Sequence, residues 1–135
     1  MIKLLDDIFI TAGFKRKGNN WVMNGEEINK IINLQKSQYN NSFYINYGYV
    51  INRLPLNGFV NHVDNRLSSA SNLEDIRISE NMRITYLLSL ESDIADNDRL
   101  VQLKELINDK VLTEMNSTNN EQDLLSILKN GITSK

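Results

Sequence analysis

Apolar and polar positions alternate through much of the first half of the chain. Within residues 14–54, apolar side chains recur at every second position in runs separated by two short polar tips, Asn24-Gly25 and Asn40-Asn41. Alternation with a period of two is typical of a half-buried strand, and Asn-Gly is a strong signal for a two-residue hairpin turn. The pattern therefore predicts a three-strand antiparallel meander over residues 14–54.

The two tips also predict how the strands pair. A turn at the first tip pairs Trp21 with Ile28, and a turn at the second tip pairs Leu34 with Tyr47. A four-residue loop at the second tip is the alternative. Because side chains of a strand alternate between the two faces of a sheet, one face collects aromatic and aliphatic residues and is expected to be the core. These residues are Trp21, Ile28, Ile32, Leu34, Phe43, Ile45, Tyr47 and Tyr49.

The opposite face of the predicted sheet carries amide and hydroxyl groups. Its residues are Asn33, Gln35, Ser37, Tyr44 and Asn46. Amides both donate and accept hydrogen bonds, so a row of them can bind a peptide, a ligand or a partner surface. The same pattern also fits a solvated outer face, which antiparallel sheets commonly have. These five residues are the candidate binding residues of the sheet.

The segment after the meander predicts a further strand. Pro55 and Gly58 end the third strand, and residues 60–67 then alternate so that Val60, His62, Asp64 and Arg66 would share one face. A short fourth strand is consistent with this pattern. His62 and Arg66 on one strand face are the remaining candidate binding residues.

Helical spacing dominates the two ends of the chain. Apolar residues from Ile2 to Ala12 predict a short amphipathic helix that ends at Gly13. Residues 68–75 are rich in Ser and Asn and predict a loop, and residues 76–90 favour a helix over a buried strand. Asp96 or Asn97 is expected to cap the next helix, whose apolar stripe consists of Leu100, Leu103, Leu106, Ile107 and Val111. Asn119 or Asn120 is expected to cap a last helix, with Gly131 as its end.

These elements predict one α+β domain over residues 1–135. It consists of an N-terminal helix, an antiparallel meander of three to four strands, and two to three C-terminal helices packed on one sheet face. With 135 residues, of which 41% are hydrophobic, the chain has enough apolar material for a single modest core.

The composition excludes several kinds of chemistry. The chain has no cysteine and His62 is its one histidine, so disulfides, thiol catalysis and metal sites with two imidazoles are excluded. His62 beside Asp64 resembles a general base with an orienting carboxylate, and it equally resembles a hydrogen-bonded structural group. We expect no catalytic residue, no metal ligand and no cofactor.

Charge and hydropathy narrow the class of partner. The net charge is −2, and the basic cluster Lys15, Arg16 and Lys17 is small, so we do not expect nucleic-acid binding. The cluster instead fits an edge strand that is kept soluble by charge. No apolar run approaches the length that spans a bilayer, and acidic residues interrupt the apolar stretch at the N-terminus. We expect a cytoplasmic protein with a possible protein partner, and the sequence leaves the oligomeric state open.

Three segments carry a resemblance to a known family. They are GFKRKGNNW at residues 13–21, INLQKS at 32–37 and FYINYG at 43–48, followed by Arg66-Leu67. Together they resemble the domain of unknown function 4304 family. The resemblance implies a small bacterial α+β domain and carries over no activity.

The function expected from these observations is non-enzymatic. We expect a bacterial interaction protein, immunity-like in size and type, that binds a macromolecular partner through the polar sheet face. The alternative is an enzyme or small-ligand pocket centred on His62 and Arg66 and bordered by Tyr44 and Asn46. A deep pocket enclosing His62 and Arg66 would favour the alternative, and an open polar sheet would favour the interaction protein.

Overall fold

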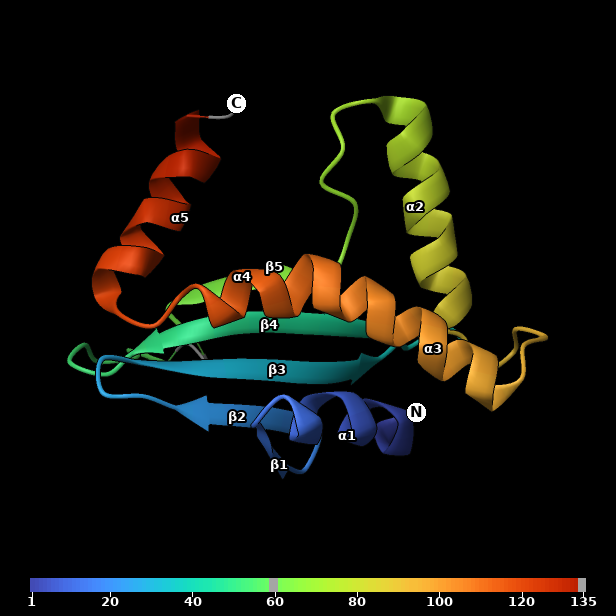
Figure 1. The fold of residues 1–135 in the computed structure, drawn as a ribbon, viewed down its shortest axis with the longest axis horizontal. Coiled ribbons are helices and arrows are strands. Elements are labelled where there is room, and N and C mark those ends of the chain that lie inside the picture. The colour runs from blue at the N-terminus through green and yellow to red at the C-terminus, as the bar shows by residue number, and fades with distance from the viewer. Residues whose placement is uncertain (59–60, 134–135) are drawn as a thin grey trace.

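A computed structural model describes residues 1–58 and 61–133 of the chain and confirms the α+β class. An N-terminal helix precedes an antiparallel sheet, and helices follow it (Figure 1). In chain order the elements are α1 (Ile2–Thr11), β1 (Lys15–Lys17), β2 (Asn20–Asn24), β3 (Ile28–Lys36), β4 (Phe43–Ile51), β5 (Val63–Arg66), α2 (Glu74–Leu87), α3 (Asp96–Ile107), the π-helical turn η1 (Asn108–Leu112), α4 (Thr113–Asn116) and α5 (Glu121–Thr133).

The predicted number of strands was too low. Over the described residues the sheet has five strands in the order β1-β2-β3-β4-β5, and each neighbouring pair is antiparallel. The predicted first strand is split into β1 and β2 by a tight turn, in which Gly18 has a φ of +62° and Lys17 pairs with Asn20. Glycine adopts this left-handed conformation without the steric cost of a Cβ. The predicted further strand forms as β5 from Val63, whereas Val60 lies outside the described residues.

The predicted pairings were wrong, yet the predicted faces are right. Trp21 pairs with Ile32 instead of Ile28, and Leu34 pairs with Ile45 instead of Tyr47. The partner moves by four positions in the first case and by two in the second. Because side chains alternate with a period of two, an even shift keeps every residue on its expected face.

Both hairpin loops are longer than two residues for identifiable reasons. In the first loop, the Asn52 side chain donates to the carbonyl oxygens of Gly25 and Glu26, and the Asn29 side chain accepts from the Gly25 N–H. These contacts hold the loop open beyond Asn24-Gly25. In the second loop, the Ser37 N–H donates to the Ser42 carbonyl at 2.9 Å, which closes the four-residue loop that was the alternative.

The apolar face of the sheet packs against helices. In Figure 1, α3, η1 and α4 follow one another across this face, and α1 lies beside β1 and β2. The core includes Trp21 and Tyr49, which are fully buried together with Leu103, Ile107 and Val111 of the predicted helical stripe. Helices α2 and α5 extend past the β5 edge of the sheet (Figure 1). The opposite, polar face of the sheet is therefore turned away from α3.

Two helix ends differ from the prediction and one agrees. Helix α3 starts at Asp96 after Ala95, with no side-chain cap, and α5 continues past Gly131 to Thr133. The Asn120 side chain caps α5, because its Oδ1 accepts from the Asp123 N–H at 2.8 Å. The first turn of α3 is exposed and carries Asp96 and Asp98, whose carboxylates are favourable at the positive end of the helix dipole.

A buried charged residue lies within the apolar face. Lys30 alternates with Ile28 and Ile32 on β3, is almost fully buried, and donates from Nζ to the Asn119 Oδ1 at 3.0 Å. Burial lowers the pKa of Lys30, and the nearby Asp123 carboxylate opposes this shift. Lys30 therefore links β3 to the start of α5.

Candidate functional site

One rung of the sheet aligns four polar side chains across four strands. The register places Asn20 opposite Asn33, Asn33 opposite Asn46, and Asn46 opposite Arg66. Arg66 Nε donates to Asn46 Oδ1 at 2.9 Å, Asn46 Nδ2 donates to Asn33 Oδ1 at 3.1 Å, and Asn33 Nδ2 donates to Asn20 Oδ1 at 2.7 Å. We call Asn20, Asn33, Asn46 and Arg66 the polar rung.

The hydrogen bonds of the polar rung all run in one direction. A guanidinium group can only donate, so Asn46 must present its oxygen to Arg66 and its NH₂ group to Asn33. The same reasoning then orients Asn33 toward Asn20. Chains of hydrogen bonds polarise one another, which strengthens the donors along the row and leaves the Asn20 NH₂ group as a polarised donor at its end. Both ends of the polar rung therefore present N–H groups.

Arg66 is held by two further contacts. Its Nη2 donates to Gln35 Oε1 at 2.8 Å, and its Cζ lies 4.2 Å from the centroid of the Tyr44 ring. Gln35 Oε1 also accepts from Asn46 Nδ2 at 3.0 Å, so it joins the guanidinium to the rung. No carboxylate among the described residues lies within 4.0 Å of a nitrogen of Arg66. The position of the guanidinium is thus fixed, while its charge has no ion-pair partner in the part of the chain that the structure describes.

An open hollow of about 700 Å³ lies over the polar rung. The rung residues line it together with Ile31, Asn61, Asp64 and Asn65. Asp64 Oδ1 accepts from Asn61 Nδ2 at 2.7 Å. The hollow is therefore lined by the fixed guanidinium of Arg66, by the carboxylate of Asp64 two residues earlier on β5, and by the neutral amide side chains of neighbouring strands.

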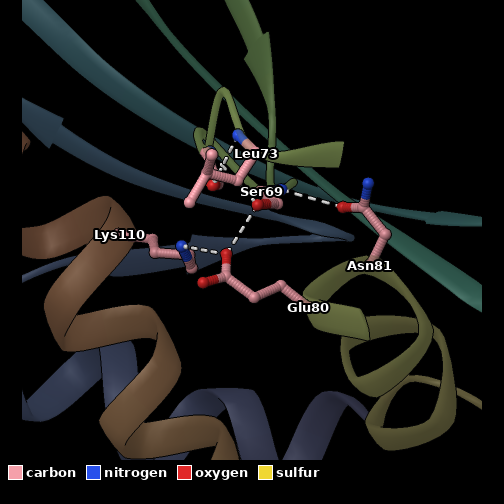
Figure 2. A network of polar contacts seen from close by, with 6 residues as sticks. Ser69, Leu73, Glu80, Asn81 and Lys110 are labelled. Carbon is pink, nitrogen blue, oxygen red and sulfur yellow. Dashed lines mark hydrogen bonds and ion pairs between the residues drawn. The ribbon is translucent and has the colours of Figure 1, made fainter. Parts of the chain in front are cut away.

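The loop after β5 is anchored by a second polar network (Figure 2). Ser69 Oγ donates to Glu80 Oε2 at 2.6 Å, Lys110 Nζ donates to the same oxygen at 3.2 Å, and the Ser69 N–H donates to Asn81 Oδ1 at 2.8 Å. The Ser69 hydroxyl, and then the Lys110 ammonium, lower the pKa of the Glu80 carboxyl. This network ties the chain three residues after Arg66 to α2 and η1.

Five of the seven predicted binding residues gather on one surface. Gln35 and Tyr44 flank Arg66, and Asn33 and Asn46 lie in the polar rung itself. Ser37 lies at the end of the face, where its Oγ accepts from the Tyr39 N–H and takes no part in the row.

His62 lies apart from the other predicted residues. Its Nδ1 accepts from the Ile51 N–H at 2.8 Å, and its Nε2 lies 3.0 Å from the Pro55 carbonyl oxygen. Nε2 must carry the proton to donate to that carbonyl, so both ring nitrogens are engaged with the backbone. His62 is not among the residues that line the hollow over the polar rung. It holds the connection between β4 and β5.

Asn20, Asn61, Asp64 and Asn65 are part of the site and were not predicted as binding residues. The predicted first hairpin would have placed Asn20 opposite Asn29, whereas the observed register places it opposite Asn33. Asn61 precedes the first residue of β5, so strand alternation does not apply to it. The signal for Asp64 was its position two residues before Arg66 on the same face.

The described residues offer no obvious metal site. No group of three or more His, Asp or Glu side chains among residues 1–58 and 61–133 is placed to hold a metal ion. In the same part of the chain, no helix is long and apolar enough to cross a membrane.

A comparison of the sequence with models of known protein families gives a match. The family model described as "Domain of unknown function (DUF4304)" matches residues 5–130, and the chain therefore belongs to this family. No curated protein and no solved structure matches the chain significantly.

Proposed function

We propose that this member of the DUF4304 family is a non-enzymatic bacterial interaction protein that binds another macromolecule through the polar face of its sheet. The observation that carries the proposal is the polar rung, in which three amides and one guanidinium form a single row across four strands. The surface lies on the five-stranded sheet, on the face turned away from α3.

The order of the row supports a recognition role. Exposed side chains lose rotamer freedom when they are fixed, and fixing them before a partner arrives reduces the entropy cost of binding. Gln35 and Tyr44 fix Arg66 in this way, and Asn33 and Asn46 fix each other. A face that serves only to contact water gains little from such an arrangement.

The proposal also covers the compartment in which the protein acts and the class of interaction protein to which it belongs. We place the protein in the bacterial cytoplasm and among immunity-like proteins, which bind and block a second macromolecule. A single acidic domain of 135 residues, without cysteine and with a net charge of −2, suits this role. Neutralisation of an adjacent toxin-like gene product upon co-expression would test the immunity-like part directly.

Partner capture tests the surface. Tagged protein is used to isolate partners from a lysate of the encoding organism, and each captured partner is then purified and its affinity is measured. The test variant is Gln35→Ala/Asn46→Ala, which breaks the row. The control is Asn108→Ala/Asn116→Ala, which removes two exposed amides from the helical side of the molecule.

We expect the test variant to bind the purified partner at least about tenfold more weakly, because it loses two groups that position Arg66. The control variant is expected to bind like the wild type. Equal partners and equal affinities for both variants would contradict the proposed surface.

A further inference from the structure

We infer that the polar rung receives the carboxylate of an acidic side chain on an extended segment of a partner protein, with Arg66 as the group that binds the carboxylate. The inference rests on the proposed function, since it concerns the same surface. It adds the chemistry of the partner, which the proposed function leaves open.

The way in which neighbouring side chains hold the guanidinium of Arg66 is the first argument. Two of its N–H groups are used by Asn46 and Gln35, and Tyr44 lies against its face, so the plane of the guanidinium is fixed. The remaining N–H groups have no hydrogen-bond partner among the described residues. A planar guanidinium with free N–H groups matches a carboxylate, which accepts two parallel hydrogen bonds. The fixed plane makes Arg66 a prepared receptor for one anion.

The charges around Arg66 favour a single carboxylate over a polyanion. Asp64 lines the same hollow, and no lysine of residues 1–58 or 61–133 does. The carboxylate of Asp64 would repel the successive phosphates of a polyanion. A partner segment with a single acidic side chain at Arg66 could instead offer Asp64 a neighbouring N–H group, which the carboxylate would accept. Nucleic-acid binding depends on several cations that neutralise successive phosphates, and among the described residues that line the hollow Arg66 is the one cation.

The dimensions of the polar rung favour an extended segment. The rung crosses three inter-strand spacings of about 4.8 Å each, or about 14 Å in all. About four extended residues span that length. At the far end, the NH₂ group of Asn20 presents a donor that suits a main-chain carbonyl. An acidic side chain at Arg66, followed by carbonyl groups toward Asn20, therefore uses both ends of the rung.

The test uses defined peptides and nuclear magnetic resonance. The probe is the capped peptide acetyl-Gly-Asp-Gly-Gly-amide, and its control is the same peptide with Asn in place of Asp. We follow the Nε–H signal of Arg66 and the side-chain amide signals of Gln35 and Asn46. The expected result is a saturable shift of these signals by the Asp peptide and an affinity at least about tenfold lower for the Asn peptide.

Two arginine variants give the test its specificity. Arg66→Gln is expected to abolish binding of the Asp peptide, and Arg66→Lys is expected to weaken it, because an ammonium lacks the planar fork. Arg77→Gln is the matched control, since Arg77 is exposed on α2 and its side chain has no hydrogen bond among the described residues. Unchanged backbone signals away from the polar face establish that each variant is folded.

Three outcomes would overturn the inference. They are equal affinities for the Asp and Asn peptides, equal losses in Arg66→Gln and Arg77→Gln, or saturation of the same signals by octathymidylate at lower concentration than by the Asp peptide. A captured partner that is lost from Gln35→Ala/Asn46→Ala and retained by Arg66→Gln would also overturn it. That last result would leave the proposed function intact, so the two claims can fail separately.

Discussion

The carbonyl oxygen of Val63 occupies the space that a side chain at Gly48 would need. An ideal Cβ built on Gly48 overlaps this oxygen and lies 3.0 Å from both Asn61 Nδ2 and Asp64 Oδ1. Gly48 pairs with Asp64 in the β4–β5 register, two positions from the pair formed by Asn46 and Arg66. The absence of a side chain at residue 48 therefore lets β5 approach β4 and complete the polar rung.

Gly48→Ala is expected to destabilise the protein by roughly 1–3 kcal/mol, because an added methyl group in filled space forces the backbone to shift. Denaturant unfolding measures the loss, and amide signals of β5 report the displacement. Gly18→Ala serves as the control, since Gly18 has a positive φ and open space around its Cβ position. It should lose about 1 kcal/mol through strain alone and leave the β5 signals unchanged. Unshifted β5 signals in Gly48→Ala would contradict the close approach.

Much of the two-faced sheet was predictable, and the polar rung was not. The faces followed from strand alternation, which survives any even shift in pairing. The exact partner of Asn20 depends on the length of the first loop, and that loop is held by Asn52, which lies 27 residues from Gly25 in the chain. Local turn chemistry contains no information about this long-range contact. The row from Asn20 to Arg66 therefore became visible only in three dimensions.

The separation of His62 from the site has a similar origin. Alternation over residues 60–67 placed His62 and Arg66 on one face, and this holds only within a regular strand. The strand begins at Val63, and the imidazole of His62 turns to the backbone of Ile51 and Pro55. Backbone groups that need partners in an irregular connection compete with strand geometry for such a side chain.

Arg99 is expected to contribute strongly to stability. Its buried Nη1 donates to the carbonyl oxygens of Leu87 at 2.6 Å and Ser89 at 2.8 Å, where α2 ends. Arg99→Met keeps most of the apolar stem and leaves both carbonyls without this donor, so we expect a loss of about 2–3 kcal/mol in the free energy of unfolding. Lys104→Met, on an exposed position of α3, should change stability by no more than about 0.5 kcal/mol. Similar losses in both variants, measured by denaturant unfolding, would rule out this role.

Ser69 is expected to control the ionisation of Glu80. The Ser69 hydroxyl stabilises the ionised carboxylate, so Ser69→Ala should raise the pKa of Glu80 toward its usual value. A lowered carboxyl pKa stabilises the fold at pH values above the usual carboxyl range, and this contribution is lost as the pH falls through the lowered pKa. In Ser69→Ala the pKa of Glu80 is closer to its usual value, so the contribution of Glu80 to the free energy of unfolding should be smaller and should be lost at a higher pH than in the wild type. Carbon-13 signals of the Glu80 carboxyl measure the shift. Ser71→Ala is the control, since the Ser71 hydroxyl accepts from the Leu73 N–H and does not contact Glu80.

Alkaline pH is expected to destabilise the fold through Tyr47. Burial, and then the charge of Glu114, raise the pKa of Tyr47 to about 12. The unfolded chain releases this proton near pH 10, so the stabilising contribution is complete below about pH 10 and is lost as the pH rises toward 12. In Tyr47→Phe, the decline in unfolding free energy between pH 10 and 12 should be smaller, while its offset from the wild type stays constant between pH 7 and 9. Parallel curves for the two proteins across the whole range would contradict this assignment.

The contact between Tyr44 and Arg66 is expected to slow the exchange of the Arg66 Nε proton with water. The ring holds the guanidinium in the plane that lets Nε donate to Asn46, and a cation–π contact at an exposed site contributes about 0.5–1 kcal/mol. Tyr44→Leu should therefore accelerate exchange of this proton by about two- to fivefold, as measured by nuclear magnetic resonance. Tyr44→Phe keeps the ring and should exchange like the wild type. If the Phe and Leu variants exchange equally fast, the ring does not position Arg66, and the guanidinium is held by Asn46 and Gln35 alone.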